Sequence, residues 1–412
     1  MARKMKDSGI EWLGEIPEGW EVAPLKRFAS IQTGNTPTKT SDSNYYASTG
    51  IPWIKPDNLG YSHSISKTSE YLTSEGALCS RIMPPNTVYV CCIGSLGKVG
   101  YSSISCACNQ QINALIFNDL MFWKYGYYLT IAQESQYLLF GNGNVLQIIN
   151  STSQGNIACV LPPLENQHLI ACYLDSVYSD IEILIAKARS SIEEYKKLKQ
   201  AVITQAVATQ QCSHIKLKYL MNVIVDCPHE TPTYSFTGNY YVIRTADQAL
   251  ASLRRDEDMY RLDASEYKKR TRRLTLDKDD IVYGREGERW GLACIVPESN
   301  KYCLGQRIMQ FRCNTKFLYP KYAMYTLNSE PVYLQGVADT IGSTSPHVNI
   351  STICNYLLPV PALTEQKEIA DYLDAKCAEI DGLIAKKEQL VKELESYKKS
   401  LIYEVVTGKR KV

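Results

Sequence analysis

The chain has 412 residues and a formal net charge of +2, with 45% hydrophobic and 21% charged residues. This length predicts two or more domains, and the composition is typical of a globular protein rather than a disordered or fibrous one. No apolar run approaches the ~18 residues of a membrane span, and the first residues do not form a signal peptide. We therefore expect a cytoplasmic protein with no membrane contact. The small net charge argues against a chain that binds nucleic acid through many phosphate contacts of its own.

The cysteines and histidines argue against a metal site. Fourteen cysteines are scattered along the chain without a C-x-x-C pair, and only five histidines are available as further ligands. This pattern does not fit a zinc site, so we expect no metal and no cofactor in this chain. The thiols are expected to be reduced and to fill core space.

In chain order, the sequence predicts a globular unit, a long helix, a second globular unit and a second long helix. We place these segments at 1–160, with an N-terminal segment at 1–20, then at 161–210, 211–360 and 361–412. Short β-branched and aromatic runs separated by Gly, Pro, Asn and Ser predict strands and long loops in both globular units. The clearest predicted strands are 87–90, 112–117, 240–243, 280–283 and 308–311.

The sequence contains one phrase twice. Residues 170–187 read IACYLDSVYSDIEILIAK, and residues 369–386, which begin 199 positions later, read IADYLDAKCAEIDGLIAK. The same offset holds without a gap from about residue 143 to residue 207, and weaker matches continue upstream. The chain is therefore predicted to be a tandem duplication with a pseudo-two-fold arrangement, as is typical of two similar units that pack together.

Each repeated phrase predicts a helix of about 40 residues, roughly 60 Å long at 1.5 Å per residue. Prolines precede both helices, neither helix contains one, and Thr407-Gly408 provides a C-terminal stop. Apolar residues spaced by three and four predict a coiled-coil seam between two antiparallel helices. The alternative is that each helix packs only on its own domain. The predicted inter-helix seam comprises Ile170, Leu174, Ile181, Leu184, Ile369, Leu373, Ile380 and Leu383.

Several phrases of this chain resemble one known family. These are SGIEWLGEIPEGWEV at 8–22, PPLENQHLIACYLD at 162–175, LTEQKEIADYLD at 363–374 and LIYEVVTGK at 401–409. They resemble the specificity (S) subunits of type I restriction–modification systems over the whole chain. The chain departs from the family pattern at Asn166 and Ala362, and the WLGEIPEGWEV phrase opens only the first unit.

The resemblance implies an α+β protein in which two α/β target recognition domains are separated by two long antiparallel coiled-coil helices. It implies that each domain reads one half of a split site in double-stranded DNA, and that the helices set the spacer. Readers about 60 Å apart would reach major grooves one or more turns of ~34–36 Å apart.

The resemblance also implies partners. The helices would dock two methyltransferase subunits, and restriction subunits would join through the complex. S-adenosylmethionine, ATP and magnesium would belong to these partner subunits, and this chain would not be an enzyme. The docked methyltransferases would supply much of the phosphate contact that the small net charge of this chain lacks.

Base recognition favours Arg or Lys for guanine and Asn or Gln for adenine. We therefore predict DNA contacts in loops of both units, and the run KKRTRR at 268–273 is predicted to contact phosphates. Trp290 is predicted to be a core residue, with stacking on DNA as the alternative. Gln110, Gln306 and Arg307 recur at matched positions and are predicted to be structural. The predicted DNA-binding residues are Thr36, Lys39, Lys55, Lys98, Asn142, Asn144, Arg244, Lys268, Lys269, Arg270, Arg272, Arg273, Arg285, Arg289, Ser343, Thr344 and His347.

Two other classes of function are weaker. Residues 94–100 lack the spacing of a phosphate-binding loop, and 284–291 is not a dinucleotide fingerprint. Catalysis by this chain alone is therefore not expected. A coiled-coil scaffold that binds proteins but not DNA would explain the helices, but it would not explain two loop-rich domains.

Overall fold

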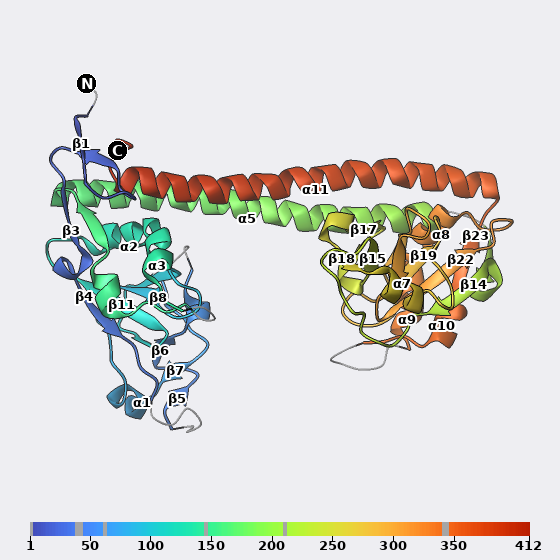
Figure 1. Cartoon of the computed structure of the whole chain (residues 1–412), viewed down its shortest axis with the longest axis horizontal. Coiled ribbons are helices and arrows are strands. Elements are labelled where there is room, and N and C mark those ends of the chain that lie inside the picture. Colours follow the sequence, from blue (N-terminus) through green and yellow to red (C-terminus); the bar gives the residue numbers. More distant parts are fainter. Residues whose placement is uncertain (1–2, 38–43, 61–63, 144–146, 209–211, 340–345) are drawn as a thin grey trace. The chain divides into compact units, whose positions relative to one another are not determined.

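The computed structural model describes residues 3–37, 44–60, 64–143, 147–208, 212–339 and 346–412. It divides into unit 1, Met1–Arg189 with Gln389–Val412, and unit 2, Ser190–Glu388. Each unit contains one globular domain and part of two long helices, α5 (Leu164–Ala208) and α11 (Leu363–Val406) (Figure 1). The predicted segments treated each helix as a separate body, whereas the compact units divide both helices.

Unit 1 contains two four-stranded sheets, one of order β4-β11-β8-β9 and one of order β10-β6-β7-β5. Strand β8 reads TVYVC and is buried along its whole length, as expected for a β-branched and aromatic run in a sheet core. The helices α2 and α3 lie between the first sheet and α5 in Figure 1. The strands are β1 (Met5–Asp7), β2 (Glu15–Pro17), β3 (Glu21–Pro24), β4 (Ala29–Thr33), β5 (Tyr46–Ala47), β6 (Ile51–Ile54), β7 (Tyr71–Leu72), β8 (Thr87–Cys91), β9 (Val99–Ser102), β10 (Ala107–Cys108), β11 (Ile112–Phe117) and β12 (Ala158–Leu161). The shorter helices are η1 (Leu25–Arg27), η2 (Pro56–Asn58), α1 (Ser74–Leu78), α2 (Trp123–Ala132), α3 (Glu134–Phe140) and α4 (Ser151–Gly155).

Unit 2 contains a four-stranded sheet of order β14-β22-β19-β20 and a three-stranded sheet of order β18-β15-β21. The five strands predicted most clearly from the sequence are confirmed as β8, β11, β15, β19 and β22. The strands of unit 2 are β13 (Ser213–Lys216), β14 (Met221–Asp226), β15 (Tyr240–Ile243), β16 (Gln248–Ala249), β17 (Ser252–Leu253), β18 (Tyr260–Leu262), β19 (Ile281–Gly284), β20 (Ala293–Ile295), β21 (Tyr302–Leu304), β22 (Ile308–Cys313) and β23 (Leu357–Val360). The helices are α6 (Leu217–Leu220), η3 (Thr245–Asp247), η4 (Asp256–Asp258), α7 (Ala264–Arg270), α8 (Pro320–Leu327), α9 (Glu330–Val337) and α10 (Ile350–Cys354).

The two units repeat one topology. The antiparallel sheet β4-β11-β8-β9 corresponds to β14-β22-β19-β20, and the parallel pair β6–β10 corresponds to β15–β21. Strand β3 pairs antiparallel with β12, and β13 pairs in the same way with β23. The predicted tandem duplication is confirmed, and the second domain begins with the same strand pairing although it lacks the WLGEIPEGWEV phrase.

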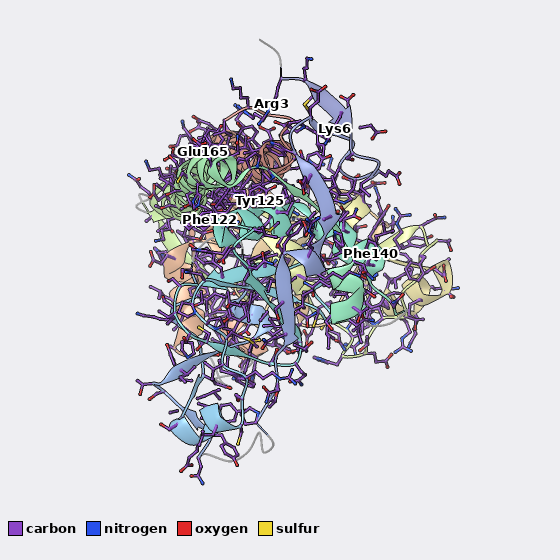
Figure 2. All side chains as sticks on the ribbon, turned by 90° about the vertical axis from the view of Figure 1, so that its left-hand side faces the viewer. Arg3, Lys6, Phe122, Tyr125, Phe140 and Glu165 are labelled. Atoms are coloured by element: carbon purple, nitrogen blue, oxygen red, sulfur yellow. The ribbon has the colours of Figure 1, made fainter. Side chains whose placement is uncertain are left out.

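Each long helix begins with a buried glutamine that holds it to its own domain. Gln167 donates to the carbonyls of Leu120 (3.1 Å) and Pro162 (2.9 Å) and accepts from the Phe122 N–H (2.7 Å). Gln366 makes the same three contacts with the corresponding backbone groups of unit 2. Figure 2 labels Phe122 and Tyr125 just below α5, next to Glu165. The repeated glutamine therefore positions the helix relative to the domain.

A second repeated residue extends this attachment about two turns further along the helix. Asp175 accepts from the Tyr128 hydroxyl (2.8 Å) and pairs with Lys124. In unit 2, Asp374 accepts from the Tyr325 hydroxyl (2.7 Å) and pairs with a lysine of α8. The identical aspartates of the doubled phrase thus bind the domain and do not belong to an inter-helix seam.

Part of the predicted inter-helix seam is wrong. Six of the eight residues are buried, but Leu184 and Leu383 are 51% and 36% exposed. In α5 the buried positions continue from Ile181 to Ile185, Ala188 and Ile192. A helix has 3.6 residues per turn, so the residue before Ile185 lies about 100° around the helix and faces outward.

The buried seam residues pack on the domain and on the other helix together. In unit 1, Ile170, Leu174 and Ile181 share one core cluster with domain residues and with the end of α11. In unit 2, Ile369 and Leu373 share a core cluster with Ile203 of α5. The sequence left open whether each helix packs on its own domain or on the other helix. These residues do both.

Ion pairs show that the helices run antiparallel within a unit. In unit 1, Glu182 pairs with Lys398 (2.5 Å) and Arg189 pairs with Glu395 (2.8 Å), so the numbering rises along α5 while it falls along α11. In unit 2, the buried Lys199 donates to both carboxylate oxygens of Asp381. Lys199 and Lys398 occupy matching positions of the repeat.

The N-terminal segment packs on the end of α11 within unit 1. The side chains of Leu13, Ile16 and Trp20 are buried in the same core cluster as the last turns of α11. The Tyr403 hydroxyl donates to the Trp12 carbonyl (2.8 Å). The phrase is therefore part of the core of unit 1, where it covers the end of α11.

Gly408 ends α11 as predicted and carries a testable consequence. Its φ is +75°, and a Cβ atom there would lie 2.6 Å from the Pro17 ring. We expect Gly408→Ala to lower the free energy of unfolding by about 2 to 4 kcal/mol, because strain and overpacking add. Gly382 of α11 has open space around its Cα, so Gly382→Ala should stabilise by ~0.5–1 kcal/mol. Denaturant unfolding of both variants is the measurement, and equal effects of the two substitutions would contradict this account.

The cysteines behave as predicted. All fourteen are free, and most are buried. Burial raises the pKa of Cys108 and of Cys294 to about 12. At neutral pH these thiols are protonated and serve as small apolar core residues.

Candidate nucleic-acid interface

Four loops of unit 2 meet at one end of its main sheet. The N–H of Arg285 donates to the Arg307 carbonyl (3.0 Å), and the N–H of Gly287 donates to the Pro346 carbonyl (2.9 Å). The N–H of Val348 donates in turn to the Arg285 carbonyl (3.1 Å). These bonds hold together what we call the unit 2 loop cluster, residues 226–231, 284–291, 305–307 and 346–348.

The unit 2 loop cluster is charged. The guanidinium of Arg285 is largely buried and donates to both oxygens of Asp226, at 3.2 and 3.3 Å, and to Glu286 at 2.6 Å. Asp226 also lies 3.1 Å from the ring of His229. Glu286 lies 4.0 Å from Nε of Arg307, whose side chain is 53% exposed. Arg285 therefore braces the two acids from inside the protein, so its predicted role as a DNA contact is wrong, whereas Arg307 lies at the surface.

Unit 1 contains the same framework. The N–H of Cys92 donates to the Gln111 carbonyl (2.8 Å), and the N–H of Gly94 donates to the Gln147 carbonyl (3.0 Å). The N–H of Ile149 donates to the Cys92 carbonyl (3.0 Å). We call this group the unit 1 loop cluster, residues 33–36, 92–98, 109–111 and 147–149.

The two loop clusters match in backbone and differ in side chains. Gly94 and Gly287 both have positive φ, +81° and +85°, which favours glycine at the same turn. Each of the three backbone hydrogen bonds within unit 1 has a counterpart within unit 2, and this correspondence matches the bonded residues one to one. The matched side chains are Cys92 with Arg285, Ile93 with Glu286, Gln111 with Arg307 and Ile148 with His347. Thus one fold carries mostly uncharged side chains in unit 1 and charged ones in unit 2, with Cys92 and Arg285 buried and the other pairs at least partly exposed.

The recurring glutamines are structural, as expected. Gln110 accepts from the Thr36 hydroxyl, and Gln306 donates to the Thr231 hydroxyl (3.3 Å). Each bond joins the loop after the first sheet strand, β4 or β14, to the loop before the last one along the chain, β11 or β22. The glutamines thus maintain the cluster in both units.

The predicted DNA contacts of unit 1 lie in or near the unit 1 loop cluster. Thr36 is bonded to a glutamine, as described, and Lys98 donates to the Pro56 carbonyl (3.3 Å). Lys55 pairs with Glu70 (2.8 Å). Asn142 is exposed and exchanges two backbone hydrogen bonds with Ile148. Two further predicted residues, Lys39 and Asn144, lie outside the described residues.

Three predicted residues of unit 2 are brought together around the unit 2 loop cluster. Arg244 donates twice to Asp247 (2.9 Å each) and stacks on Tyr260, with its guanidinium carbon 3.8 Å from the ring centroid. Arg289 donates to two backbone carbonyls of the turn after β15, and the backbone of His347 pairs with that of Glu286 in an isolated β-bridge. Ser343 and Thr344 lie outside the described residues.

Only some side chains of the basic run at 268–273 are exposed. Arg270 is 7% exposed and donates to the carbonyls of Leu304 and Glu230, so its predicted role as an exposed phosphate contact is wrong. It faces inward because the carbonyls that it serves belong to β21 and to the loop after β14, which lie against the end of α7. Lys269 pairs with Glu230 (2.8 Å), and this hydrogen bond lowers the pKa of Glu230. The other three residues, Lys268, Arg272 and Arg273, are exposed.

These basic residues line a pocket that adjoins the unit 2 loop cluster. Its wall is shared between the loop after β14 and the end of α7, and its lining residues are Pro228, His229, Glu230, Lys269, Arg270, Arg272 and Arg273. Lys269 is paired with Glu230 and Arg270 donates to backbone carbonyls, so the exposed Arg272 and Arg273 are the cations that would favour an anionic group such as a backbone phosphate here.

The structure adds residues that the sequence reasoning missed. Tyr234 and Phe236, on the loop before β15, and Tyr260, at the start of β18, are exposed and line one pocket; Tyr260 stacks under Arg244, and Phe236 is fully exposed. Aromatic residues interleaved with arginines are typical of nucleic-acid surfaces, and this signal was available in the run TYSF. Trp290, by contrast, is buried and stacks on Tyr333 at 4.4 Å, so the prediction that it is a core residue is confirmed.

Within the described residues, no group of three or more His, Cys, Asp or Glu side chains is placed to hold a metal ion. Over the same part of the chain, none of the helices combines the length and the apolarity needed to cross a membrane.

Comparison with known proteins gives consistent matches. The family described as type I restriction modification DNA specificity domain matches residues 17–194 and 227–393. The chain is 23% identical to the type I restriction enzyme MjaVIII specificity subunit of Methanocaldococcus jannaschii, over 96% of this chain and 94% of that protein. It is 30% identical to the HindI specificity subunit of Haemophilus influenzae, over 36% of this chain and 33% of that protein. Its fold is similar to a chain in a solved structure on complex assembly and conformational transition of the type I R-M system, with a TM-score of 0.70, 15% identity and coverage of 95% and 98%.

Proposed function

Because the chain belongs to the family of type I restriction modification DNA specificity domains, we propose that it is the DNA-specificity subunit of a type I restriction–modification complex. Each globular domain reads one half of a bipartite site in double-stranded DNA. The subunit selects the site and leaves the chemistry to its partners. It acts in the cytoplasm, where the host DNA lies.

One observation carries this proposal. The two loop clusters share the same three backbone hydrogen bonds but carry different side chains at the matched positions. A framework that is kept while its exposed residues change is what two readers of different sequences need. It follows that the two half-sites differ and that the whole site is not palindromic.

Exposed apolar residues on the long helices support docking of two copies of one partner. Leu184 and Leu383 are exposed at matching positions of the repeat, and so are Leu198 and Tyr397. Tyr372 is exposed eleven residues before Leu383, which is three helical turns and therefore the same face. Apolar residues that recur on the outside of a repeated helix indicate a protein interface. In this proposal the partners are two methyltransferase subunits, and restriction subunits join through them.

The partners supply the cofactors in this proposal. S-adenosylmethionine would bind to the methyltransferase subunits, and ATP and magnesium to the restriction subunits. The role of this chain is to hold the DNA in register with those subunits. Its own near-neutral charge fits a subunit that shares the phosphate contacts with its partners.

Methylation sequencing tests the proposal directly. We expect the genome of the host to carry methylated adenines in a bipartite motif with a spacer of fixed length. Deletion of the gene for this chain should remove the methylation at every copy of the motif, and restoring the gene should return it. A continuous palindromic motif would contradict the two-reader proposal. A stable complex with the methyltransferase that binds all DNA sequences equally would instead favour a protein-binding scaffold.

A further inference from the structure

Arg307 has an unusual backbone conformation at the centre of the unit 2 loop cluster. It joins β21 to β22, and its φ of +68° lies in the left-handed region that side chains with a Cβ rarely adopt. Among the described residues, four others that are not glycine have positive φ, namely Asn86, Ala251, Asp279 and Asn300. Three of these are Asn or Asp, which tolerate this conformation. Arg307 therefore stands out as a strained position occupied by a long side chain.

The framework itself does not require this strain. Gln111 occupies the matching position before β11, and its carbonyl accepts the same hydrogen bond as that of Arg307. Gln111 is not among the described residues with positive φ. In unit 2 the N–H of Arg307 is instead turned onto Cys227 Sγ (3.2 Å). A strained residue that the fold can avoid is a reason to look for a function.

The guanidinium of Arg307 is oriented by its surroundings, but most of its N–H donors remain available. Its Nη1 lies 3.6 Å from the position that a Cβ at Gly287 would occupy, so the guanidinium extends over the Gly287 turn. Glu286, the acid next to it, is engaged by Arg285 at 2.6 Å and is 4.0 Å from Arg307 Nε. The guanidinium is thus oriented by a weak ion pair and keeps most of its donors open at the surface.

We propose that Arg307 is a specificity-determining residue that contacts a base of the second half-site. This inference rests on the proposed function of the chain as a DNA reader. Its planar fork of donors suits the O6 and N7 acceptors of a guanine in the major groove. The buried Arg285 contributes indirectly, because it holds Glu286 and so positions Arg307. This proposal replaces the structural role that the sequence predicted for Arg307, because its side chain is exposed and its backbone is strained. The matching Gln111 would give unit 1 a different base preference at the same place.

The test uses Arg307→Gly and Arg307→Gln in the full chain assembled with its methyltransferase subunits. Glycine accepts a positive φ, so Arg307→Gly should leave the thermal midpoint of unfolding unchanged or raise it by about 2 to 4 °C. Binding to a duplex with the motif that the wild-type complex methylates should fall about 10- to 100-fold. Discrimination against a duplex with one guanine of the second half-site replaced should fall by a similar factor.

Two comparisons make the test decisive. Arg307→Gln carries the residue of unit 1 and should lose the same discrimination. Arg255→Gly removes another exposed arginine of unit 2, which pairs only loosely with Glu257 (3.4 Å), and should keep the discrimination of the wild type. Unchanged discrimination in Arg307→Gly, or an equal loss on all duplexes, would overturn the inference. If the wild-type complex itself failed to select a bipartite duplex, the proposed function would fall first.

Discussion

Replacing Gln167 with alanine is expected to lower the free energy of unfolding by about 3 to 5 kcal/mol. The side chain is almost fully buried and serves one backbone N–H and two backbone carbonyls at the start of α5. Truncation leaves these three groups without partners in a region closed to water, and each costs ~1–3 kcal/mol. Gln366 has the same surroundings at the start of α11, so Gln366→Ala should show the same loss.

The matched control is Gln389→Ala, in the exposed part of α11. Gln389 bonds only to Glu393, one turn away on the same helix, and its removal should change stability by a few tenths of a kcal/mol. Chemical denaturation of the three variants and the wild type provides the comparison. A loss below about 1 kcal/mol for Gln167→Ala would mean that water replaces the side chain, and that the doubled phrase does not attach the helix in the way described.

Placing glutamate at both Leu184 and Leu383 is expected to weaken assembly with the methyltransferase subunits by at least about 100-fold. The two leucines are exposed at matching positions of the repeat. A carboxylate buried in a protein interface without a partner costs several kcal/mol, and about 2.7 kcal/mol is already 100-fold. Because both leucines face outward in the free chain, its own folding should be nearly unchanged.

Ile183→Glu is the control for this experiment. Ile183 is as exposed as Leu184 but has Gly382, and no apolar side chain, at the matching position of the second helix. It also lies about 100° around the helix from Leu184. Assembly of this variant should stay within about threefold of the wild type, measured by titration and size-exclusion chromatography. If Ile183→Glu were as damaging as the leucine pair, the interface would not follow the repeated positions.

The charge difference between the loop clusters bears on how the two half-sites are bound. Unit 2 offers Arg307, the exposed residues of the run at 268–273 and the pocket beside them, whereas the matched loops of unit 1 are mostly uncharged. Phosphate contacts make affinity depend on salt, and hydrogen bonds from neutral side chains do so much less. In the proposed function, unit 2 therefore provides most of the electrostatic anchoring by this chain.

The predicted DNA contacts show where sequence reasoning stops. Residue type and loop position were enough to place Arg244, Arg285 and His347 in one region. They did not reveal that Arg270 and Arg285 point into the protein, because a buried arginine and a surface arginine look alike in a run of letters. Their inward orientation depends on carbonyls and carboxylates that come from distant strands.

The matching of the two loop clusters is only partly visible along the chain. The offset between matched residues is 199 near the helices, but insertions change it in the loops. The sequence matches Gln111 with Arg307, because each follows a recurring glutamine, whereas only the repeated hydrogen bonds match Cys92 with Arg285. The same comparison reveals the strain at Arg307, which no residue pattern predicts.

The sequence alone determined the tandem duplication, the two long helices and the main strands, because periodicity and repetition are local properties of the chain. It also determined where the helices begin and end, since prolines and Gly408 act within a few residues. The tertiary structure decided which helix face is buried. A predicted seam that included Leu184 gave way to Ile185, because burial depends on what lies opposite each turn. It likewise decided which arginines are free to meet DNA, because a charged side chain is positioned by partners far away in the sequence.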